Sequence, residues 1–494
     1  MGRRVLVCDL NNFARYPTIS VGYLVAVLRR AGHKVELFSP WSVGIGGYTR
    51  EPPVRPWGLI DQRLRMRSAF SASPLVRRVR AELGRRFAQS DLARQSARLE
   101  THFRAALARG PDAVLMSTYL MYRDIVERLC ALCHAAGVPT IVGGPYFTDL
   151  KVREAWRGIP GLTALSVGEN ELAAADLVEC LASGAAAASL PAIATHATRG
   201  PRRPTPFRAL DELPYPDYTD FPWARYPTRI VSAITGRGCG WGACRFCSDI
   251  TSTAGRTFRS RSPESVVAEI DHQCAHYDAR HVVFTDLKLN SDRAAWHGLI
   301  DGLSRRKPRV EWIGAVHIDE DGSHALEPAT IRQAAEAGLV RLTTGLESGS
   351  QRVLDLMKKG TQLAETSHVL RGAAAAGVSV RATVMVGYPG ETARDVAATA
   401  RFLDDHREAI ERVSLNRFTL MTGTAIDRMI EKKPERFDTV RVLARNDAQA
   451  TVDHVSLLAQ GRDFRRELRR VLGVVHQINR RPLRPRARAF AGVM

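Results

Sequence analysis

Three cysteines near the middle of the chain, Cys239, Cys244 and Cys247, lie on one glycine-rich segment directly after a β-branched run. Three thiolates on one loop can hold three irons of a four-iron cluster and leave the fourth iron open for a small ligand. A structural zinc site would need a fourth ligand nearby, and the next cysteine, Cys274, falls in an expected helix. The pattern predicts a [4Fe-4S] cluster with an open iron. A zinc knuckle and a chance grouping of cysteines are the alternatives.

The size and composition of the chain indicate a globular protein. Its 494 residues are enough for two or three domains. No apolar run approaches the roughly 18 residues of a transmembrane helix, and Arg3 and Arg4 lead into a strand-like run without a signal peptide. Eight cysteines in this length do not form a disulfide scaffold. We therefore expect a cytoplasmic protein with no membrane partner.

The formal net charge is +20, and much of the excess lies in two arginine-rich stretches, 63–109 and 462–488. Such stretches are commonly solvated helix faces, or they form a surface for an anionic ligand or RNA. No RNA-binding signature with interleaved aromatic residues is present. The charge therefore favours an anionic substrate over nucleic acid, which we do not expect as a partner.

The first 185 residues alternate between strand and helix patterns. Strands are expected at 5–10, 34–38, 113–117, 140–142 and 162–167, with helices at 20–31 and 123–136 and an arginine-rich helical insertion at about 60–108. Alternation of this kind predicts a parallel, doubly wound sheet. Ligands of such α/β sheets bind beyond the carboxyl ends of the strands. A proline-rich, extended connector is expected at 186–228.

The alternation resumes after the connector. Six strands are expected at 230–234, 281–285, 310–315, 340–344, 378–386 and 413–420, with helices between them. Six such units fit a partial TIM barrel over residues 229–427, whose active site would lie at the carboxyl ends of the strands. We expect residues 428–494 to form a small, basic, helical region.

The cysteine segment resembles the cluster loop of the radical S-adenosylmethionine (SAM) enzymes. That family usually places three residues and then two between its cysteines, whereas this chain has four and then two. The extra residue falls among Gly240 to Ala243, where glycines permit a one-residue bulge. The segment 345–349, Gly-Leu-Glu-Ser-Gly, resembles the family motif that holds the amino-acid portion of SAM. The resemblance implies SAM contacts from Gly345, Glu347 and Ser348.

Two further residues are candidates for the SAM site. Phe246 precedes the third cysteine and is placed to stack near the adenine, with plain loop packing as the alternative. Arg381 lies inside the fifth expected barrel strand, where a buried charge needs a partner. That partner is either the SAM carboxylate or a structural carboxylate of the protein.

The N-terminal region resembles the cobalamin-binding domain that precedes many radical SAM domains. The resemblance is carried by segment 23–32, by 142–145 (Val-Gly-Gly-Pro) and by 168–171 (Gly-Glu-Asn-Glu). It departs from the cobalt-ligating Asp-x-His-x-x-Gly motif, because Leu132 precedes Cys133 and His134 where the motif has Asp. The implied cobalamin contacts are Ser117, Thr118, Gly143, Gly144, Pro145 and Glu169, without a histidine ligand to cobalt.

Several polar residues follow barrel strands or lie on the sixth one, and all could point into the barrel mouth. Substrate binding, proton removal, helix capping and local pairing are all open to them. They are Asp286, Lys288, Asn290, His317, Asn416 and Arg417.

The resemblance implies a radical SAM enzyme that binds a [4Fe-4S] cluster, SAM and cobalamin and receives electrons from a donor such as flavodoxin or ferredoxin. The leading hypothesis is a C-methyltransferase that acts on a small molecule or peptide in natural-product biosynthesis. A non-methylating enzyme of the same architecture, such as a cyclase, is the first alternative. An RNA methylthiotransferase would need three more cluster cysteines in the N-terminal domain, and a non-enzymatic binding module would not bind SAM.

Overall fold

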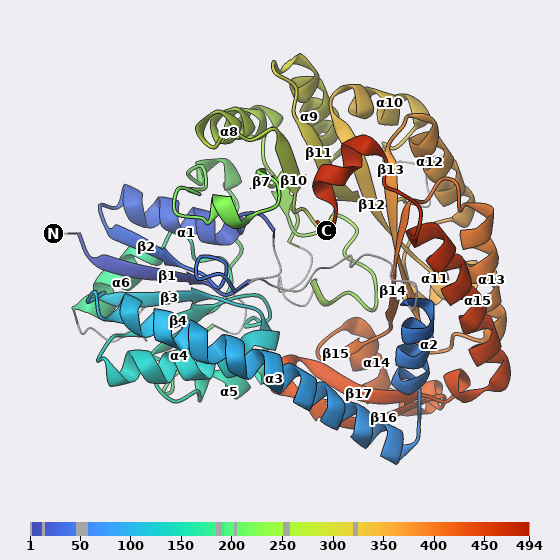
Figure 1. Ribbon diagram of the computed structural model, residues 1–494, viewed down its shortest axis with the longest axis horizontal. Helices are drawn as coiled ribbons and strands as arrows, with labels where there is room; N and C mark the ends of the chain where they lie inside the picture. The colour runs from blue at the N-terminus through green and yellow to red at the C-terminus, as the bar shows by residue number, and fades with distance from the viewer. Residues whose placement is uncertain are drawn as a thin grey trace.

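The computed structural model describes residues 2–11, 15–45, 58–183, 190, 192–201, 205–249, 257–319 and 325–493. Two six-stranded sheets dominate it, one on the N-terminal side and one on the C-terminal side (Figure 1). The expected boundary between residues 185 and 186 lies outside the described residues. In the described part of the chain, every helix is too short or too polar to cross a lipid bilayer.

The N-terminal sheet has the order β2-β1-β3-β4-β5-β6. All neighbouring strands are parallel except β6, which pairs antiparallel with β5. Because β6 falls in the segment expected to be an extended connector, that expectation is wrong at this point: the chain adds a strand to the sheet before it leaves the domain. The strands are β1 (Arg4–Asp9), β2 (Lys34–Phe38), β3 (Ala113–Ser117), β4 (Thr140–Gly143), β5 (Ala164–Ser166) and β6 (Ile193–Ala194).

Helices cover both faces of this sheet (Figure 1). In β1, Val5 and Val7 pack in one buried cluster and Leu6 and Cys8 in another, because successive side chains of a strand point to opposite faces. A strand buried on both faces is typical of doubly wound α/β folds. The first face is covered by α1 (Ile19–Arg30) and α6 (Ala174–Ala182), and the second by α4 (Arg123–Ala135) and α5 (Leu150–Arg157).

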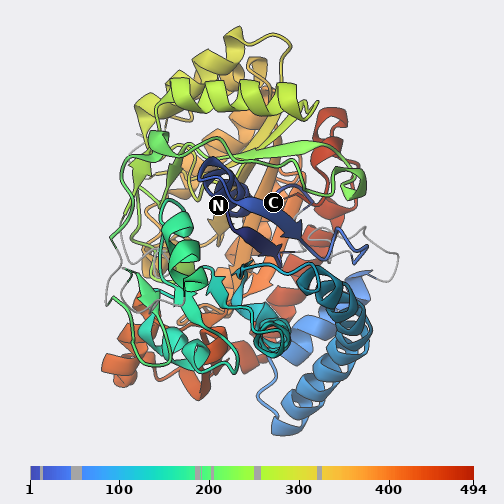
Figure 2. The ribbon, with the colours of Figure 1, turned by 90° about the vertical axis from the view of Figure 1, so that its left-hand side faces the viewer.

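The arginine-rich insertion forms α2 (Gly58–Ala69) and α3 (Pro74–Leu107). It leaves the N-terminal sheet, since α2 packs against the C-terminal helix α15 (Arg462–Asn479), with the Phe70 ring 5.9 Å from that of Phe464. Figure 2 shows the long blue α3 running along one side of the molecule back toward the N-terminal strands. The insertion therefore links the two halves of the chain.

The second sheet is entirely parallel, with the order β14-β13-β12-β11-β10-β7. No pairing joins β7 to β14 among the described residues, so the six strands form a partial barrel, as predicted. The strands are β7 (Ile230–Ala233), β10 (His281–Phe284), β11 (Glu311–Val316), β12 (Leu339–Glu347), β13 (Ser379–Val386) and β14 (Arg412–Arg417). The helices are α8 (Pro263–His276), α9 (Arg293–Arg305), α10 (Pro328–Glu336), α11 (Gln351–Met357), α12 (Leu363–Ala375) and α13 (Ala393–Asp405).

The C-terminal region is only partly helical, which corrects the expectation for residues 428–494. The strands β16 (Val440–Asn446) and β17 (Thr451–Ser456) form an antiparallel hairpin, and β17 also pairs with β15 (Leu420–Met421). Most of the edge strand β16 is exposed, and it carries Arg441 and Arg445, since charged side chains are common on exposed sheet edges. The helices here are α14 (Ala425–Lys432) and α15.

The end of the chain closes the barrel at the amino ends of its strands. The 3₁₀ segment η8 (Pro485–Phe490) places Phe490 in a buried cluster with Ile230, Val283, Ile313 and Val340. Arg341, fully buried in β12, donates to the Phe490 carbonyl at 3.3 Å. In barrels this end serves stability, and the opposite end carries the active site.

Replacing Phe490 by alanine should lower the free energy of unfolding by about 3 to 5 kcal/mol, because it empties a fully buried aromatic site. Urea denaturation followed by tryptophan fluorescence measures the change. Arg486→Ala is the control: it removes an exposed ion pair with Glu311, which is worth less than about 1 kcal/mol. Equal shifts in the two variants would show that η8 is not part of the barrel core.

Candidate cofactor site

The cysteine loop leaves the carboxyl end of β7 and is pinned by Asp286, which follows β10. The Asp286 carboxylate accepts from the Thr235 amide and hydroxyl at 3.0 and 2.7 Å and from the Gly236 amide at 2.9 Å. Burial raises the pKa of Asp286 to about 6, and these donors oppose the shift. Of the roles open to Asp286, the structure shows local pairing, which fixes the start of the loop.

The two strands of a short hairpin flank the cysteines. Its strands β8 (Gly236–Arg237) and β9 (Arg259–Ser260) pair antiparallel. Cys239 comes two residues after β8, and its preceding residue Gly238 has a φ of 87°, which favours glycine. The cysteine loop therefore begins from a fixed base rather than from a free chain end.

The loop is also fastened to the chain after α11. The Arg245 amide donates to the Met357 carbonyl at 2.8 Å, and the Trp241 indole donates to the Lys358 carbonyl at 3.1 Å. At Gly360, with a φ of 62°, a Cβ atom would lie 2.2 Å from the Trp241 ring. Only glycine therefore allows Trp241 to lie against this turn.

Lys359 lies among the three thiols and is buried. Burial by itself lowers the pKa of Lys359, but Glu347 and then Cys244, Cys247 and Cys239 raise it. Its ammonium lies 3.6 Å from the Glu347 carboxylate. Lys359 was not singled out from the sequence.

The three thiols share this cation but do not form a tight group. Among the described residues, no three His, Cys, Asp or Glu side chains gather closely enough to hold a single metal ion. A four-iron cluster binds each thiolate through a different iron, so its ligands need not meet at one point. Burial raises the pKa of Cys244, and Lys359 opposes that shift, as a thiolate ligand requires.

Glu347 ends β12 at the barrel interior, with a φ of 59°. Thr383 on β13 donates to its carboxylate at 3.4 Å. A Cβ atom on Gly345 would lie 2.4 Å from the Glu347 carboxylate and 2.8 Å from the Lys359 ammonium. Gly345 is therefore a position where the backbone passes close to both charged groups, and its contact with SAM stays a prediction. Thr383 was not identified from the sequence.

Side chains alternate along β13: Val380, Ala382 and Val384 pack in the core outside the barrel. Arg381 therefore points to the opposite, interior face, as Thr383 does. This places Arg381, 6% exposed, on the barrel face that carries Glu347. The arrangement agrees with the expected position but leaves the SAM-carboxylate role a prediction.

Two candidate residues are engaged by the protein itself. The fully buried Ser348 hydroxyl lies 3.2 Å from the Thr399 hydroxyl and accepts from the Ser350 amide. Phe246 packs against the cluster that contains Met357 and Tyr388, with the Lys359 ammonium 5.9 Å from its ring centre. Their contacts with SAM stay predictions.

A second network surrounds the barrel mouth near Trp241. Lys288 contacts Asp319 at 3.1 Å, His317 contacts the same carboxylate at 3.2 Å, and Asn290 exchanges hydrogen bonds with the His317 backbone. The His317 ring stacks 6.0 Å from the Trp241 ring. Three of the predicted polar residues thus meet beside the cysteine loop.

Arg417 does not point into the barrel mouth, which corrects that expectation. It pairs with Val386 in the sheet, and its side chain lies on the same face of β14 as those of Val413 and Leu415. Those two side chains pack in the core outside the barrel. Its guanidinium lies in a narrow recess beside Arg77, Arg80 and His454, and it donates to the His454 carbonyl at 2.9 Å. Asn416 is exposed and donates to Ser414 at 3.3 Å.

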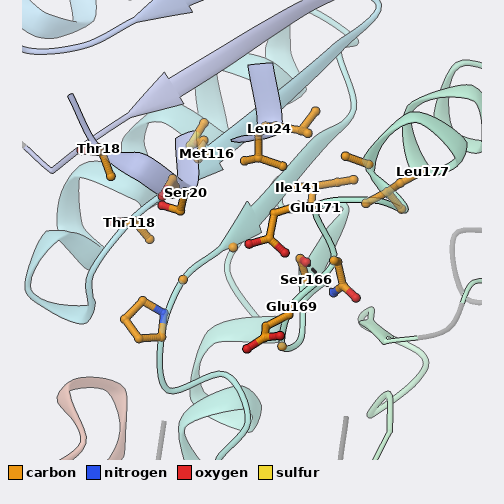
Figure 3. Close-up of a pocket in the computed structure, with 18 of the residues that line it drawn as sticks. Thr18, Ser20, Leu24, Met116, Thr118, Ile141, Ser166, Glu169, Glu171 and Leu177 are labelled. Atoms are coloured by element: carbon orange, nitrogen blue, oxygen red, sulfur yellow. Dashed lines mark hydrogen bonds between the residues drawn. The ribbon is translucent and has the colours of Figure 1, made fainter. Parts of the chain in front are cut away.

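A cavity with a volume of about 310 Å³ opens at the carboxyl ends of β3, β4 and β5 (Figure 3). A Cβ atom on Gly144 would lie 2.1 Å from the Thr118 carbonyl, so only glycine allows the two backbone segments to lie this close at the cavity floor. All six residues predicted to contact cobalamin line this cavity: Ser117, Thr118, Gly143, Gly144, Pro145 and Glu169. His134, at the end of α4, does not line it.

The cavity and the cysteine loop adjoin. Tyr146 follows the cavity residue Pro145 with a φ of 77°. Burial raises the pKa of Tyr146, and Asp249 and Cys247 of the cysteine loop raise it further. Glu169, which lines the cavity, contacts Arg259 at 2.7 Å and Arg237 at 3.4 Å, and Glu171 contacts Arg237 at 2.8 Å. Neither Tyr146 nor these arginines were singled out from the sequence.

Comparisons with known proteins agree with this layout. The model of the Radical SAM superfamily matches residues 233–403. An uncharacterized methyltransferase of Pyrococcus horikoshii, PH0819, is 27% identical over 309 residues, 59% of this chain and 64% of that protein. The anaerobic magnesium-protoporphyrin IX monomethyl ester cyclase of Rubrivivax gelatinosus is 26% identical over 282 residues, 54% of this chain and 49% of that protein. The matches thus span about half to two thirds of the length of these relatives.

Among solved structures, the radical SAM methyltransferase TsrM of Kitasatospora setae, with cobalamin and a [4Fe-4S] cluster bound, shares the fold. Its TM-score is 0.64 at 15% identity, over 91% of this chain and 85% of that one. Residues 233–403 are therefore a domain of the radical SAM superfamily. The chain as a whole shares the fold of the TsrM structure, which confirms the predicted fold class, and the family match confirms the predicted radical SAM domain.

Lys359→Met should raise the pKa of the Cys244 thiol, because it removes the cation that lowers it. The rate of thiol alkylation at slightly alkaline pH should then fall several-fold, with the pH profile displaced upward. Alkylation of the apoprotein, with each cysteine quantified by peptide mass spectrometry, measures this. Lys358→Met, which removes a neighbouring exposed lysine, should leave the profile unchanged. An unchanged profile in Lys359→Met would contradict the assigned role.

The raised pKa of Asp286 leads us to expect that the free energy of unfolding depends on pH in a specific way. Its pKa of about 6 lies above the ordinary value of about 3.9, so the folded chain holds this proton more tightly than the unfolded chain. The stability that this group contributes is therefore lost as the pH rises from about 4 to about 6. Asp286→Asn should remove about 3 kcal/mol of that decline, measured by urea denaturation at both ends of the interval. Asp301→Asn, at an exposed ion pair with Arg305, should leave the decline as in the wild type.

Proposed function

We propose that this chain is a cobalamin-dependent radical SAM methyltransferase that transfers a methyl group to an unactivated carbon. The observation that carries the proposal is the contact between the cavity and the cysteine loop. A glycine-floored cavity at the carboxyl edge of a doubly wound sheet is joined by Tyr146, Glu169 and Glu171 to the loop that carries three thiols. A methyl donor and a radical source need such adjacency, because the reacting groups must come into contact.

The residues present suit each cofactor. Cys239, Cys244 and Cys247 would hold three irons of the cluster, and Lys359 would offset part of the negative charge of their thiolates. Glu347 would accept the SAM ammonium, with Arg381 on the same barrel face for the carboxylate. The corrin would lie over Ser117, Thr118, Gly143, Gly144 and Pro145. No histidine lines the described cavity, so we expect no histidine ligand to cobalt.

When bound, these cofactors supply a 5′-deoxyadenosyl radical and a transferable methyl group. The chain's own residues then bind, orient and shield. The buried Glu347 and Lys359 neutralise one another when SAM is absent, and the SAM ammonium would compete with Lys359 for the carboxylate. The bonds from Asp286 to Thr235 and Gly236 hold the loop base fixed, which limits the reorganisation needed on binding.

We infer a small-molecule or peptide substrate in natural-product biosynthesis, with an anionic group favoured by the net charge of +20. A flavodoxin or ferredoxin would supply electrons in the cytoplasm, because a cluster of this kind needs a strong reductant and little oxygen. A non-methylating cyclisation is the second candidate, favoured by the similarity to the cyclase of Rubrivivax gelatinosus. The product mass separates the two: methylation adds one CH₂ group, and an oxidative cyclisation does not.

Cofactor content tests the proposal. The chain, purified without oxygen and supplied with iron, sulfide and hydroxocobalamin, should bind about four irons and one corrin. Cys244→Ala should lose the iron and still bind corrin at saturating concentration. Ser117→Phe, which fills the cavity at the end of β3, should lower the corrin affinity at least about tenfold and keep the iron, because it displaces the ligand from its site. Iron without corrin in the wild-type chain would make the non-methylating enzyme the better account.

A further inference from the structure

Two arginines join the base of the cysteine loop to the wall of the cavity. Arg237 is the last residue of β8, and Arg259 is its partner in β9. Their guanidinium groups reach the carboxylates of Glu169 and Glu171, which follow β5 in the N-terminal sheet. Figure 3 shows Glu169 and Glu171 among the side chains that line the cavity.

These ion pairs are sheltered from solvent. The side chains of Arg259 and Arg237 are 8% and 14% exposed, and those of Glu171 and Glu169 are 14% and 22% exposed. The Arg237 guanidinium also lies 5.7 Å from the centre of the Tyr23 ring on α1. Exposed ion pairs contribute little and move freely, whereas breaking a buried pair costs several kcal/mol because it leaves a buried charge. The position of each arginine is therefore tied to the position of its carboxylate.

Glu171 lines the cavity and can accept further hydrogen bonds. Its Oε1 atom accepts from Arg237, and its Oε2 atom has no hydrogen-bond partner among the described residues. An ionised carboxylate can accept several hydrogen bonds. A ligand in the cavity with amide N–H groups at its edge, as a corrin has, can donate to this free oxygen. Such a bond would fix the Glu171 carboxylate and, through it, Arg237.

Arg237 stands two residues before Cys239, with only Gly238 between them. Gly238 has a φ of 87°, a conformation that glycine adopts without steric cost, and β8 pairs with β9 directly before it. We propose that Arg237 is a positioning residue that couples ligand occupancy of the cavity to the geometry of the cysteine loop. This inference rests on the proposed function, since it takes the cavity ligand to be a corrin.

Coupling of this kind is reciprocal. If corrin binding orders Arg237, then cluster binding, which orders the cysteine loop, must order Arg237 as well. The cavity of the cluster-loaded chain must then bind corrin more tightly. Typical coupling between two sites changes affinity by about 5- to 150-fold. The measurable quantity is the ratio of the corrin dissociation constants for the chain without and with its cluster.

The experiment titrates hydroxocobalamin into the full chain, as apoprotein and after anaerobic cluster reconstitution, with bound corrin followed by equilibrium dialysis. We expect a ratio of at least about fivefold in the wild type and a ratio near one in Arg237→Gln. Arg237→Lys keeps the charge but cannot pair with two carboxylates as a guanidinium does, so it should retain only part of the ratio. Glu171→Gln, which leaves Glu169 to hold Arg237, should also lower the ratio and guards against a folding defect in the arginine variant.

Arg3→Gln is the matched control, because Arg3 pairs with Glu179 at 3.1 Å in the same domain and does not line the cavity. It should keep the wild-type ratio. A purely structural role for Arg237 would weaken both affinities equally and leave the ratio unchanged, which would overturn the inference. A wild-type ratio of one would do the same. Failure of the wild-type chain to bind corrin in either form would instead overturn the proposed function, and this inference with it.

Discussion

The meeting of two carboxyl edges is the constraint on which the site depends. Both large sheets are parallel along most of their order, so each gathers its strand-to-helix loops at a single edge. The cysteine loop comes from one edge and the cavity from the other, and the ion pairs from Glu169 and Glu171 to Arg237 and Arg259 join them. Without that contact, each half would be an ordinary α/β unit with a loop and a pocket.

Other parts of the molecule hold the two edges in place. The insertion α2–α3 leaves the N-terminal sheet and packs against α15, which in turn packs against α13 outside the barrel. At the opposite end of the barrel, η8 covers the amino ends of the strands with Phe490. The stabilising contacts thus lie away from the cysteine loop and the cavity, where the side chains stay available for ligands.

The centre of the site is organised around buried charge. Lys359 is held between Glu347 and three thiols, and its burial is tolerated because acidic groups surround it. The same lysine counteracts the effect of burial on Cys244. A single cation thus connects the end of β12 with the cysteine loop, two segments that are about one hundred residues apart in the chain.

Local sequence patterns were enough to predict which segments are strands, which residues follow them and which cysteines share a loop. Hydrophobic periodicity is a local signal, so the six barrel strands were predictable, whereas the cavity residues from Ser117 to Glu169 came from the resemblance to the cobalamin-binding domain. The C-terminal hairpin β16–β17 was missed, although Val440, Val442 and Ala444 of β16 alternate with other residues as in a strand.

Contacts between residues that are distant in the chain became known only from the three-dimensional structure. The partners of Glu169, the role of Asp286 as a loop anchor and the outward direction of Arg417 depend on register and on the docking of the two sheets. Lys359 and Tyr146 acquire significance only from neighbours that are distant in the chain. Long-range electrostatic contacts leave no periodic trace in a sequence, since each needs only one charged residue at the right place in space.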